Sequence, residues 1–277
     1  MKVKEFIFLL GVKPRPKTYG FVIEAYYLPG EGRVEVARWL HPGAHHIEPT
    51  QAAVDQLRQF LRPGDVAVDI GAHTGDTTIP MALAVGPSGL VLALEPNPYV
   101  FPILEQNAAL NPGKISVVPL PFAAMRVDGQ YEFQYGGPGF CNGGFHEGMS
   151  RWLHGSAFKV HVEGKNLLDF IAQRYPDLIP RIRFIKIDTE GFDLAVLETL
   201  ETLLRSQHPY LQVEMFNLRK SIAGYRLNLY RFLLDHGYEL HRIQSGQLWG
   251  SLISLDNLML WNHYDVFCIP TRNKTRD

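Results

Sequence analysis

The sequence predicts an α/β fold in which a mostly parallel, seven-stranded sheet carries helices on both faces. Two observations support this prediction. From residue 50 onward, short apolar segments typical of strands alternate with longer segments of helical periodicity. The strand segments, such as Val66–Val68 and Leu90–Leu94, are apolar without interruption, as expected of strands that are buried on both faces.

Residues 1–49 are expected to form an extension before the main domain, residues 50–277. Within the extension, Thr18–Leu28 and Arg33–Leu40 have the composition of strands, and the turn sequence Pro29–Gly32 separates them. This pattern predicts an N-terminal β-hairpin.

The main domain is expected to contain seven strands, most of them followed by a helix. Thr50 is a candidate helix N-cap, and Ala53 and Leu57 follow it at helical spacing. The strands are expected at Asp65–Ile70, Leu90–Glu95, Ile115–Pro119, Arg183–Asp188, Tyr210–Met215, Tyr238–Ile243 and Tyr264–Ile269. The later helices are expected at about Thr74–Val85, Pro98–Leu110, Phe192–Leu204 and Leu227–His236.

The alternation of strands and helices breaks between the third and fourth strands, over residues 120–165. This region contains the Gly-rich stretch Gly136–Gly144, flanked by the strand-like segments Gln130–Tyr135 and Phe158–Val162. The pattern predicts an inserted β-hairpin with a long tip. Long loops inside compact domains are usually functional or disordered.

Composition narrows the class of protein. The formal net charge of −1 argues against a dedicated nucleic-acid-binding protein, which usually carries a basic face. Two distant cysteines, Cys141 and Cys268, do not make a disulfide framework, and the apolar run Phe6–Leu10 is too short to span a bilayer. We therefore expect a cytoplasmic protein without integral membrane contact. The histidines of the extension are expected in a solvated loop, since no carboxylate or cysteine accompanies them: His41, His45 and His46.

A loop with two glycines, Asp69-Ile70-Gly71-Ala72-His73-Thr74-Gly75, follows the first strand of the main domain. Ligands of open α/β sheets bind at the carboxyl ends of the strands. Gly71 permits a sharp turn and close approach of a ligand to the backbone. A dinucleotide site would have glycine in place of His73, because a pyrophosphate lies against bare backbone. The loop fits better a ligand with a carboxylate and a nucleoside, and a tight turn without a ligand is the alternative.

Polar residues also follow other strands. Glu95 ends an apolar run 24 positions after Gly71, where a carboxylate can accept hydrogen bonds from ribose hydroxyls. In the fourth strand, Lys186 and Asp188 share a face. A buried lysine needs a partner, which Asp188, Glu190 or Glu214 could supply. A structural ion pair without chemistry is the alternative reading.

Together these segments resemble the FkbM-type family of methyltransferases, which use S-adenosylmethionine (SAM) and have a Rossmann-like sheet. Val68–Gly75 is similar to the family's SAM loop, although the family usually has Asn at the position of His73. Glu95–Pro98 is similar to its ribose motif, and Ala123 falls where the family places a residue near adenine.

The most distinctive part of the resemblance lies later in the chain. Phe184–Gly191, continuing to Val196–Glu198, is similar to the segment that selects the family, and Pro209–Glu214 resembles the segment after it. The resemblance covers roughly residues 50–245. It covers the N-terminal extension and the Gly-rich insertion poorly.

The resemblance implies O-methylation of a hydroxyl on a sugar or other small metabolite, with S-adenosylhomocysteine (SAH) as product. For removal of the hydroxyl proton, Asp188 is the first candidate, Glu190 the second and His146, on the Gly-rich loop, the third. Asp188 with Glu214 could alternatively hold Mg²⁺, which is not favoured because no dense acidic cluster is present. The residues expected to bind SAM are Asp69, Gly71, Ala72, His73, Gly75, Glu95, Asn97, Ala123 and Asp188.

Three other classes of protein compete with this interpretation. A nicotinamide-dependent oxidoreductase conflicts with His73 at the glycine position, while a SAM-binding protein without catalysis is opposed only by the presence of Asp188 and Glu190. A nucleic-acid methyltransferase would need a basic face or an Asn-Pro-Pro-Tyr motif, and neither is evident. The sequence leaves the oligomeric state open, since the N-terminal hairpin could pair with another chain or cover the acceptor site.

Overall fold

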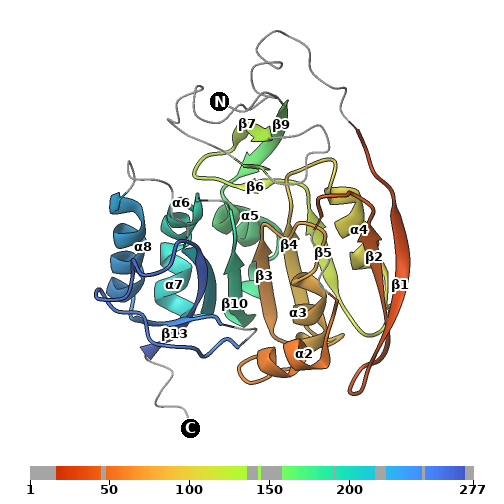
Figure 1. The fold of residues 1–277 in the computed structure, drawn as a ribbon, viewed down its shortest axis with the longest axis horizontal. Helices are drawn as coiled ribbons and strands as arrows, with labels where there is room; N and C mark the ends of the chain where they lie inside the picture. Colours follow the sequence, from red (N-terminus) through yellow and green to blue (C-terminus); the bar gives the residue numbers. More distant parts are fainter. Residues whose placement is uncertain are drawn as a thin grey trace.

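The structure is a computed structural model of the chain (Figure 1). It describes residues 17–44, 48–135, 143–144, 158–189, 191–215, 223–244 and 247–271. The described residues form a seven-stranded sheet, a two-stranded sheet near the N-terminus, and a small four-stranded sheet. These elements confirm the predicted fold class.

The seven-stranded sheet has the strand order β12-β13-β11-β10-β3-β4-β5. All neighbouring pairs from β11 to β5 are parallel, whereas β13 runs antiparallel to both β11 and β12. The bounds are β3 (Val66–Ile70), β4 (Leu90–Leu94), β5 (Val117–Leu120), β10 (Ile182–Ile187), β11 (Tyr210–Met215), β12 (Tyr238–Arg242) and β13 (Tyr264–Pro270). All seven strands overlap the segments expected from the sequence.

The direction in which the sheet grows reverses beside β3. The chain adds β4 and β5 on one side of β3 and later adds β10 and β11 on the other side. Such a reversal is a topological switch point, where the loops after two neighbouring strands separate and leave room for a ligand. The carboxyl ends of β3 and β10 therefore define the place to look for a site.

Two apolar layers cover the two faces of the sheet, because successive strand residues point to opposite sides. On one face, Val68 and Ile70 of β3 pack in a cluster that draws on later helices. These are α5 (Leu167–Arg174), α6 (Asp193–Thr199), α7 (Glu201–Gln207) and α8 (Ala223–Asp235). On the other face, Ala67 packs in a cluster with α2 (Gln51–Leu57) and α3 (Thr78–Val85). The alternation explains why both Ala67 and Val68 must be apolar.

Four predicted helices differ from those observed. The helix α4 (Phe101–Ala109) begins three residues later than expected, and α8 extends four residues further toward the N-terminus. The helix expected from Thr74 begins only at Thr78, because a turn closed by the Gly75 amide on the Ala72 carbonyl precedes it. The helix expected over Phe192–Leu204 is divided into α6 and α7, which meet at Leu200. The helix α5 and the 3-10 helix Pro176–Arg181 had not been expected.

The predicted N-terminal hairpin is confirmed as β1 (Phe21–Leu28) and β2 (Gly32–Trp39). Ala37 and Trp39 of β2 pack on α4 (Phe101–Ala109), which lies beside the sheet (Figure 1). The side chain of Asn107 on α4 joins the hairpin to the loop after β3. It accepts from the Ala37 amide at 2.7 Å, and it donates to the carbonyl oxygens of Ala37 at 3.1 Å and of Thr74 at 2.7 Å.

The predicted inserted hairpin is also confirmed. Strands β7 (Gly129–Tyr135) and β9 (Phe158–Lys165) pair antiparallel, and β6 (Ala123–Ala124) and β8 (Gly143–Gly144) complete the small sheet. Figure 1 shows this sheet beyond one end of the main sheet. Apart from β8, the Gly-rich tip lies outside the described residues.

Candidate functional site

The loop after β3 passes very close to the end of β10. Gly71 has a φ of +81°, and a Cβ atom there would lie 2.0 Å from the carbonyl oxygen of Asp188. The amides of Gly71 and Ala72 both donate to the carbonyl oxygen of Leu94, at 3.0 and 2.9 Å. Only glycine fits this turn, because a side chain would collide with backbone and the positive φ would strain it. The loop is thereby fixed against both neighbouring strands.

Asp69, the last-but-one residue of β3, is fully buried. Its Oδ2 accepts hydrogen bonds from the hydroxyls of Thr77 at 2.8 Å and Thr78 at 2.7 Å. Its Oδ1 lies 3.7 Å from the Nζ of Lys186. The carboxylate is thus occupied within the protein, where it fixes the start of α3 and balances the charge of a buried lysine.

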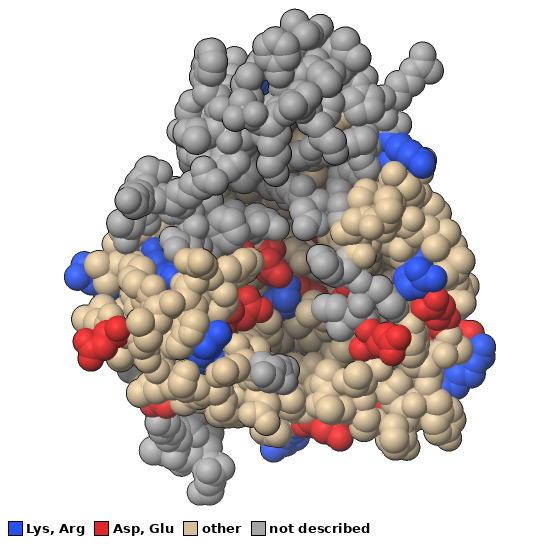
Figure 2. Space-filling model, viewed as in Figure 1, with Lys and Arg blue, Asp and Glu red and all other residues tan. Residues whose placement is uncertain are grey.

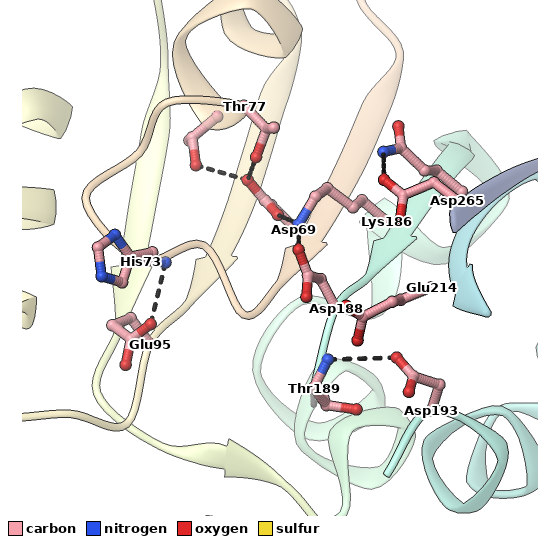
Figure 3. Close-up of polar contacts among 12 residues, drawn as sticks. Asp69, His73, Thr77, Glu95, Lys186, Asp188, Thr189, Asp193, Glu214 and Asp265 are labelled. Carbon is pink, nitrogen blue, oxygen red and sulfur yellow. Dashed lines mark hydrogen bonds and ion pairs between the residues drawn. The ribbon is translucent and has the colours of Figure 1, made fainter. Parts of the chain in front are cut away.

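Lys186 lies beside Asp69 because β10 and β3 pair in parallel with these two residues in register. Its Nζ also donates to Oδ2 of Asp188 at 3.1 Å. Burial by itself would lower the pKa of Lys186, but the carboxylates of Asp188 and Asp69 outweigh that effect and raise it. The ammonium group therefore stays charged, and Figure 3 shows it between the two carboxylates. Asp188 had been expected as a partner, whereas Asp69 had not.

Glu95, directly after β4, is buried and turned toward the same loop. Its Oε2 accepts from the His73 amide at 2.9 Å, and its Oε1 accepts from the Asn97 amide at 2.8 Å. Burial raises the pKa of Glu95 to about 7, although these two amides oppose the shift. Each oxygen keeps a second lone pair that could accept a ligand hydroxyl. His73 itself has a φ of +50°, which is uncommon for a residue other than glycine.

Asn97 and Ala123 support this end of the sheet. Asn97 is buried, and its Oδ1 accepts from the Tyr99 amide at 3.0 Å near the start of α4. Ala123 is buried in β6, three residues beyond the end of β5. The amide of Glu95 donates to the carbonyl oxygen of Leu120, the last residue of β5. The residues that follow β4 and β5, Asn97 and Ala123 among them, therefore lie at the same edge of the sheet.

Three carboxylates lie in register at the ends of β10, β11 and β13. Asp188 follows the last paired residue of β10, opposite Glu214, and Glu214 pairs with Asp265 of β13. The pKa of Asp265 is raised by burial and by the charge of Asp188, and the side chain of Gln212 donates to it at 3.1 Å. Figure 3 shows this group on the far side of Lys186 from the loop that carries His73.

Another buried carboxylate, Asp193, holds the turn after β10. Its Oδ1 accepts from the Thr189 amide at 3.2 Å, and its Oδ2 accepts from the Tyr225 hydroxyl at 3.3 Å. Burial raises the pKa of Asp193 to about 7 against the effect of its hydrogen bonds, and the charge of Asp188 adds to this rise. The sequence interpretation did not single out Asp193.

The structure also brings His263 to this edge. Its Nε2 lies 2.5 Å from Oε1 of Glu214. The sequence interpretation missed this histidine because it examined residues after strands, and His263 precedes one. The available signal was that a strand antiparallel to the others presents its beginning at the edge where the others end.

Two of the expected site residues, Glu190 and His146, lie outside the described residues. Within the part of the chain that the structure describes, no group of three or more histidine, cysteine or acidic side chains could hold a metal ion, and this includes the surroundings of Asp188 and Glu214. The same described ranges contain no helix of the length and apolarity that crossing a bilayer requires.

Figure 2 shows a hollow near the centre of one face of the molecule. Acidic and basic side chains gather inside the hollow. The arrangement can hold a ligand that offers hydroxyl donors to Glu95. A second, hydroxylated molecule could be held near Asp188 and Glu214.

Comparison with known proteins identifies the family. The model of the "Methyltransferase FkbM domain" matches residues 69–240. The chain is 28% identical over 196 residues to methyltransferase sdnD of Sordaria araneosa, covering 63% of this chain and 74% of that protein. It is 26% identical over 159 residues to the hexuronic acid methyltransferase AglP of Haloferax volcanii, covering 56% of this chain and 58% of AglP.

Among solved structures, the FkbM methyltransferase of Methylobacillus flagellatus KT matches with 14% identity and a TM-score of 0.43, over 74% of this chain and 44% of that one. Aeropyrum pernix fibrillarin with bound SAM matches with 13% identity and a TM-score of 0.43, over 93% of this chain and 98% of that one. The family match itself extends from Asp69 through Asp188 and Glu214 to β12, and so includes most of the edge described above. The chain belongs to the FkbM family of SAM-dependent methyltransferases.

Proposed function

We propose that this methyltransferase holds SAM at the switch point between β3 and β10 and transfers the methyl group to a hydroxyl of a sugar or another small hydroxylated metabolite. The observation that carries the donor site is Glu95. It is a buried carboxylate whose two oxygens are held by the amides of His73 and Asn97, next to the glycine turn at Gly71. A carboxylate so fixed suits the two ribose hydroxyls of a nucleoside.

The expected SAM-binding residues divide into two groups. Gly71, Ala72, His73 and Gly75 supply backbone around the ligand, while Glu95 supplies a carboxylate. Asp69 is proposed to act indirectly, since its carboxylate is engaged by Thr77, Thr78 and Lys186. Asn97 and Ala123 are proposed to shape the pocket, and Asp188 to face both substrates.

A hydroxyl acceptor is supported by the chemistry of the edge and by one relative. Asp188, Glu214 and Asp265 provide several acceptors for hydroxyl donors, and Lys186 lies 3.1 Å from Asp188. AglP, to which the chain is 26% identical, is by name a methyltransferase of hexuronic acid. Because the described acceptor edge is acidic, we propose that it favours a neutral sugar over a free uronic acid.

Methyl transfer to a hydroxyl also needs a group that takes the proton. Asp188, Glu190 and His146 remain the candidates that the sequence provides. Asp188 is engaged by Lys186 at 3.1 Å, so we assign it first to holding substrates and to keeping Lys186 balanced.

The test is a transfer assay with SAM that carries a radioactive methyl group. The acceptor panel contains methyl glucoside, methyl glucuronide, a deoxysugar and catechol, with an amine sugar to separate oxygen from nitrogen methylation. We expect label to appear on a neutral sugar hydroxyl and to depend on Glu95. Label on the amine alone, or on catechol alone, would contradict the proposed acceptor.

A further inference from the structure

The strand β1 has one edge with which no described strand pairs, since it forms a two-stranded sheet with β2 alone. It lies along the outer margin of the molecule, on the β5 side of the main sheet (Figure 1). Natural edge strands are commonly protected by a lysine, a proline or a bulge. The sequence of β1, FVIEAYYL, contains neither residue, and its register with β2 is continuous from Phe21 to Leu28. Such an edge is a template for another strand.

The pairing of β1 with β2 fixes which backbone groups point outward. The amide of Leu40 donates to the carbonyl oxygen of Gly20 at 2.9 Å, one position beyond the paired residues Phe21 and Trp39. Along an antiparallel strand, residues alternate between bonding one neighbour and pointing away from it. The even-numbered residues of β1 therefore bond β2. The odd-numbered residues direct their amides and carbonyls to the outer edge, and these are Phe21, Ile23, Ala25 and Tyr27.

The same odd-numbered residues carry exposed side chains. Successive side chains of a strand point to opposite faces, so these four share one face of the hairpin. Ile23 is 50% exposed and Tyr27 is 82% exposed, whereas Leu28, on the other face, is buried in the protein. A strand added to this edge would thus gain hydrogen bonds and cover apolar surface at the same residues.

The hairpin is fixed on the rest of the protein, so the edge is already formed. The Nζ of Lys114 donates to the carbonyl oxygens of Glu31 and Arg33 at the turn, both at 2.7 Å. At the other end of the hairpin, Trp39 packs on α4. Association through β1 does not have to order the strand first, which removes part of the entropic cost of binding.

Charge and symmetry favour a second copy of the chain as the partner. Glu24 is the only charged residue of β1, and it accepts a hydrogen bond from Arg38 of β2 at 2.7 Å. Because Arg38 balances this charge, two copies of β1 can approach each other. A two-fold axis presents the same edge to both copies. Like charges directly opposite each other destabilise a sheet, which disfavours any register that places Glu24 opposite Glu24.

An axis at Ala25 avoids that contact. It places Ala25 opposite Ala25 of the second copy and Ile23 opposite Tyr27, and each of these outward pairs exchanges two hydrogen bonds. A β-branched residue opposite an aromatic residue is a stabilising cross-strand pair. Glu24 then lies opposite Tyr26 and not opposite another carboxylate.

We propose that the protein forms a two-fold dimer in which the β1 strands of two copies pair antiparallel, with Ala25 at the axis. The result is a continuous sheet in the order β2-β1-β1-β2. The proposal does not depend on the identity of the methyl acceptor. The acceptor edge at β10, β11 and β13 lies on the other side of β3 from the hairpin, so the dimer leaves both acceptor edges accessible (Figure 1).

The first test is the mass of the protein in solution, measured by light scattering during chromatography at about 100 µM, a concentration at which weak complexes also associate. We expect the wild type to be a dimer and Ala25→Lys to be a monomer, because two lysines would lie opposite each other at the axis. Val127→Lys is the control, since Val127 is 68% exposed away from β1. A monomeric wild type, a dimeric Ala25→Lys, or dissociation of Val127→Lys overturns the proposal.

Charge exchange at the axis provides a stricter test that does not rest on loss of a complex. Ala25→Glu should be a monomer as well, whereas an equal mixture of Ala25→Lys and Ala25→Glu should form a heterodimer, because opposite charges then lie across the axis. A mixture that stays monomeric overturns the proposal.

Cross-linking tests the register. Ala25→Cys should form an intermolecular disulfide under mild oxidation, because the Cα atoms of a hydrogen-bonded antiparallel pair lie about 5.5 Å apart, within the range that a disulfide spans. The wild type and Val127→Cys give the background of cross-linking. Ile23→Cys should cross-link less than Ala25→Cys, since Ile23 lies opposite Tyr27. The reverse order would place the axis elsewhere and overturn the proposed register.

Discussion

At the scale of single residues, two opposing effects act on the pKa of Glu95. Its burial raises its pKa to about 7, so a proton is bound in the empty site at slightly acidic pH. Hydrogen bonds from ribose hydroxyls stabilise the ionised carboxylate and would lower that pKa. SAM binding and the loss of a proton from Glu95 should therefore be coupled.

We expect SAM binding to release protons just below neutral pH and SAM affinity to weaken as pH falls below about 7, the pKa of the unliganded site. Calorimetry in two buffers of different ionisation enthalpy measures the release directly. Glu95→Gln should abolish it and cost about 1–3 kcal/mol of binding. The exposed neighbour Glu105, changed to Gln, serves as the control. Equal heats in both buffers for the wild type would contradict this assignment.

For Asp193 we predict an effect on the free energy of unfolding and not on ligand binding. Its pKa rises from an ordinary 3.8 to about 7 on folding, so between these values the folded protein binds the extra proton. The free energy of unfolding contributed by Asp193 is thus highest below about pH 4 and is lost as pH rises toward 7.

The expected result is that Asp193→Asn is more stable than the wild type above neutral pH, provided that the amide keeps the contacts with Thr189 and Tyr225. The advantage should shrink as pH falls toward 4. Urea unfolding of both proteins across this range measures the difference, and a difference independent of pH would show that Asp193 does not titrate as described.

At the scale of elements, Asn107 connects the N-terminal hairpin to the loop after β3, which is proposed to bind SAM. Asn107 bonds Ala37 in β2 and also the carbonyl oxygen of Thr74 in the loop. Asn111 provides a comparison, because its side chain bonds the amide and carbonyl of Glu35 in the same hairpin and, among the described residues, does not bond the loop. Variants of the two asparagines can therefore distinguish two effects, the docking of the hairpin on α4 and the positioning of the loop after β3.

Asn107→Asp and Asn111→Asp each keep the acceptor oxygen and lose the donor amide. Both should lower the melting temperature, since a buried carbonyl left without a donor costs about 1–3 kcal/mol. We expect only Asn107→Asp to weaken SAM binding clearly, by about tenfold for about 1.4 kcal/mol. Equal SAM affinity in the two variants would mean that the hairpin and the loop are independent.

The elements also show what local sequence can predict. The apolar runs of β3 and β4 identify buried strands because both faces must be apolar. The start of α3 was misplaced because Asp69, eight residues earlier, binds the hydroxyls of Thr77 and Thr78, a contact that periodicity does not contain. The sequence did not predict α5 for a different reason. This helix lies between the insertion and β10, where strand-like segments dominate the pattern.

At the scale of the whole molecule, the order of the strands in the sheet determines where the candidate site lies. Candidate residues after β3, β4 and β10 could be proposed because ligands bind at carboxyl ends, and Gly71, Glu95 and Asp188 were proposed in that way. The pairing of Asp69 with Lys186 and of Glu214 with His263 could not, because both depend on register between strands far apart in the chain. A single sequence does not contain that register.

Because the proposed donor site joins β3, β4 and β10, a bound donor should stabilise the whole sheet. SAM and SAH are expected to raise the melting temperature, because a ligand at 100 times its Kd adds about 2.7 kcal/mol to the free energy of unfolding. NAD and NADP should give no shift. A shift with NAD that exceeds the shift with SAM would contradict the donor assignment.

The most direct test of the central claim is a crystal structure of the protein with SAH. We predict that the ribose hydroxyls lie within about 3 Å of the carboxylate of Glu95, with the turn at Gly71 against the ligand. A ligand whose ribose lies away from Glu95, or one that binds at another edge of the sheet, would contradict the account.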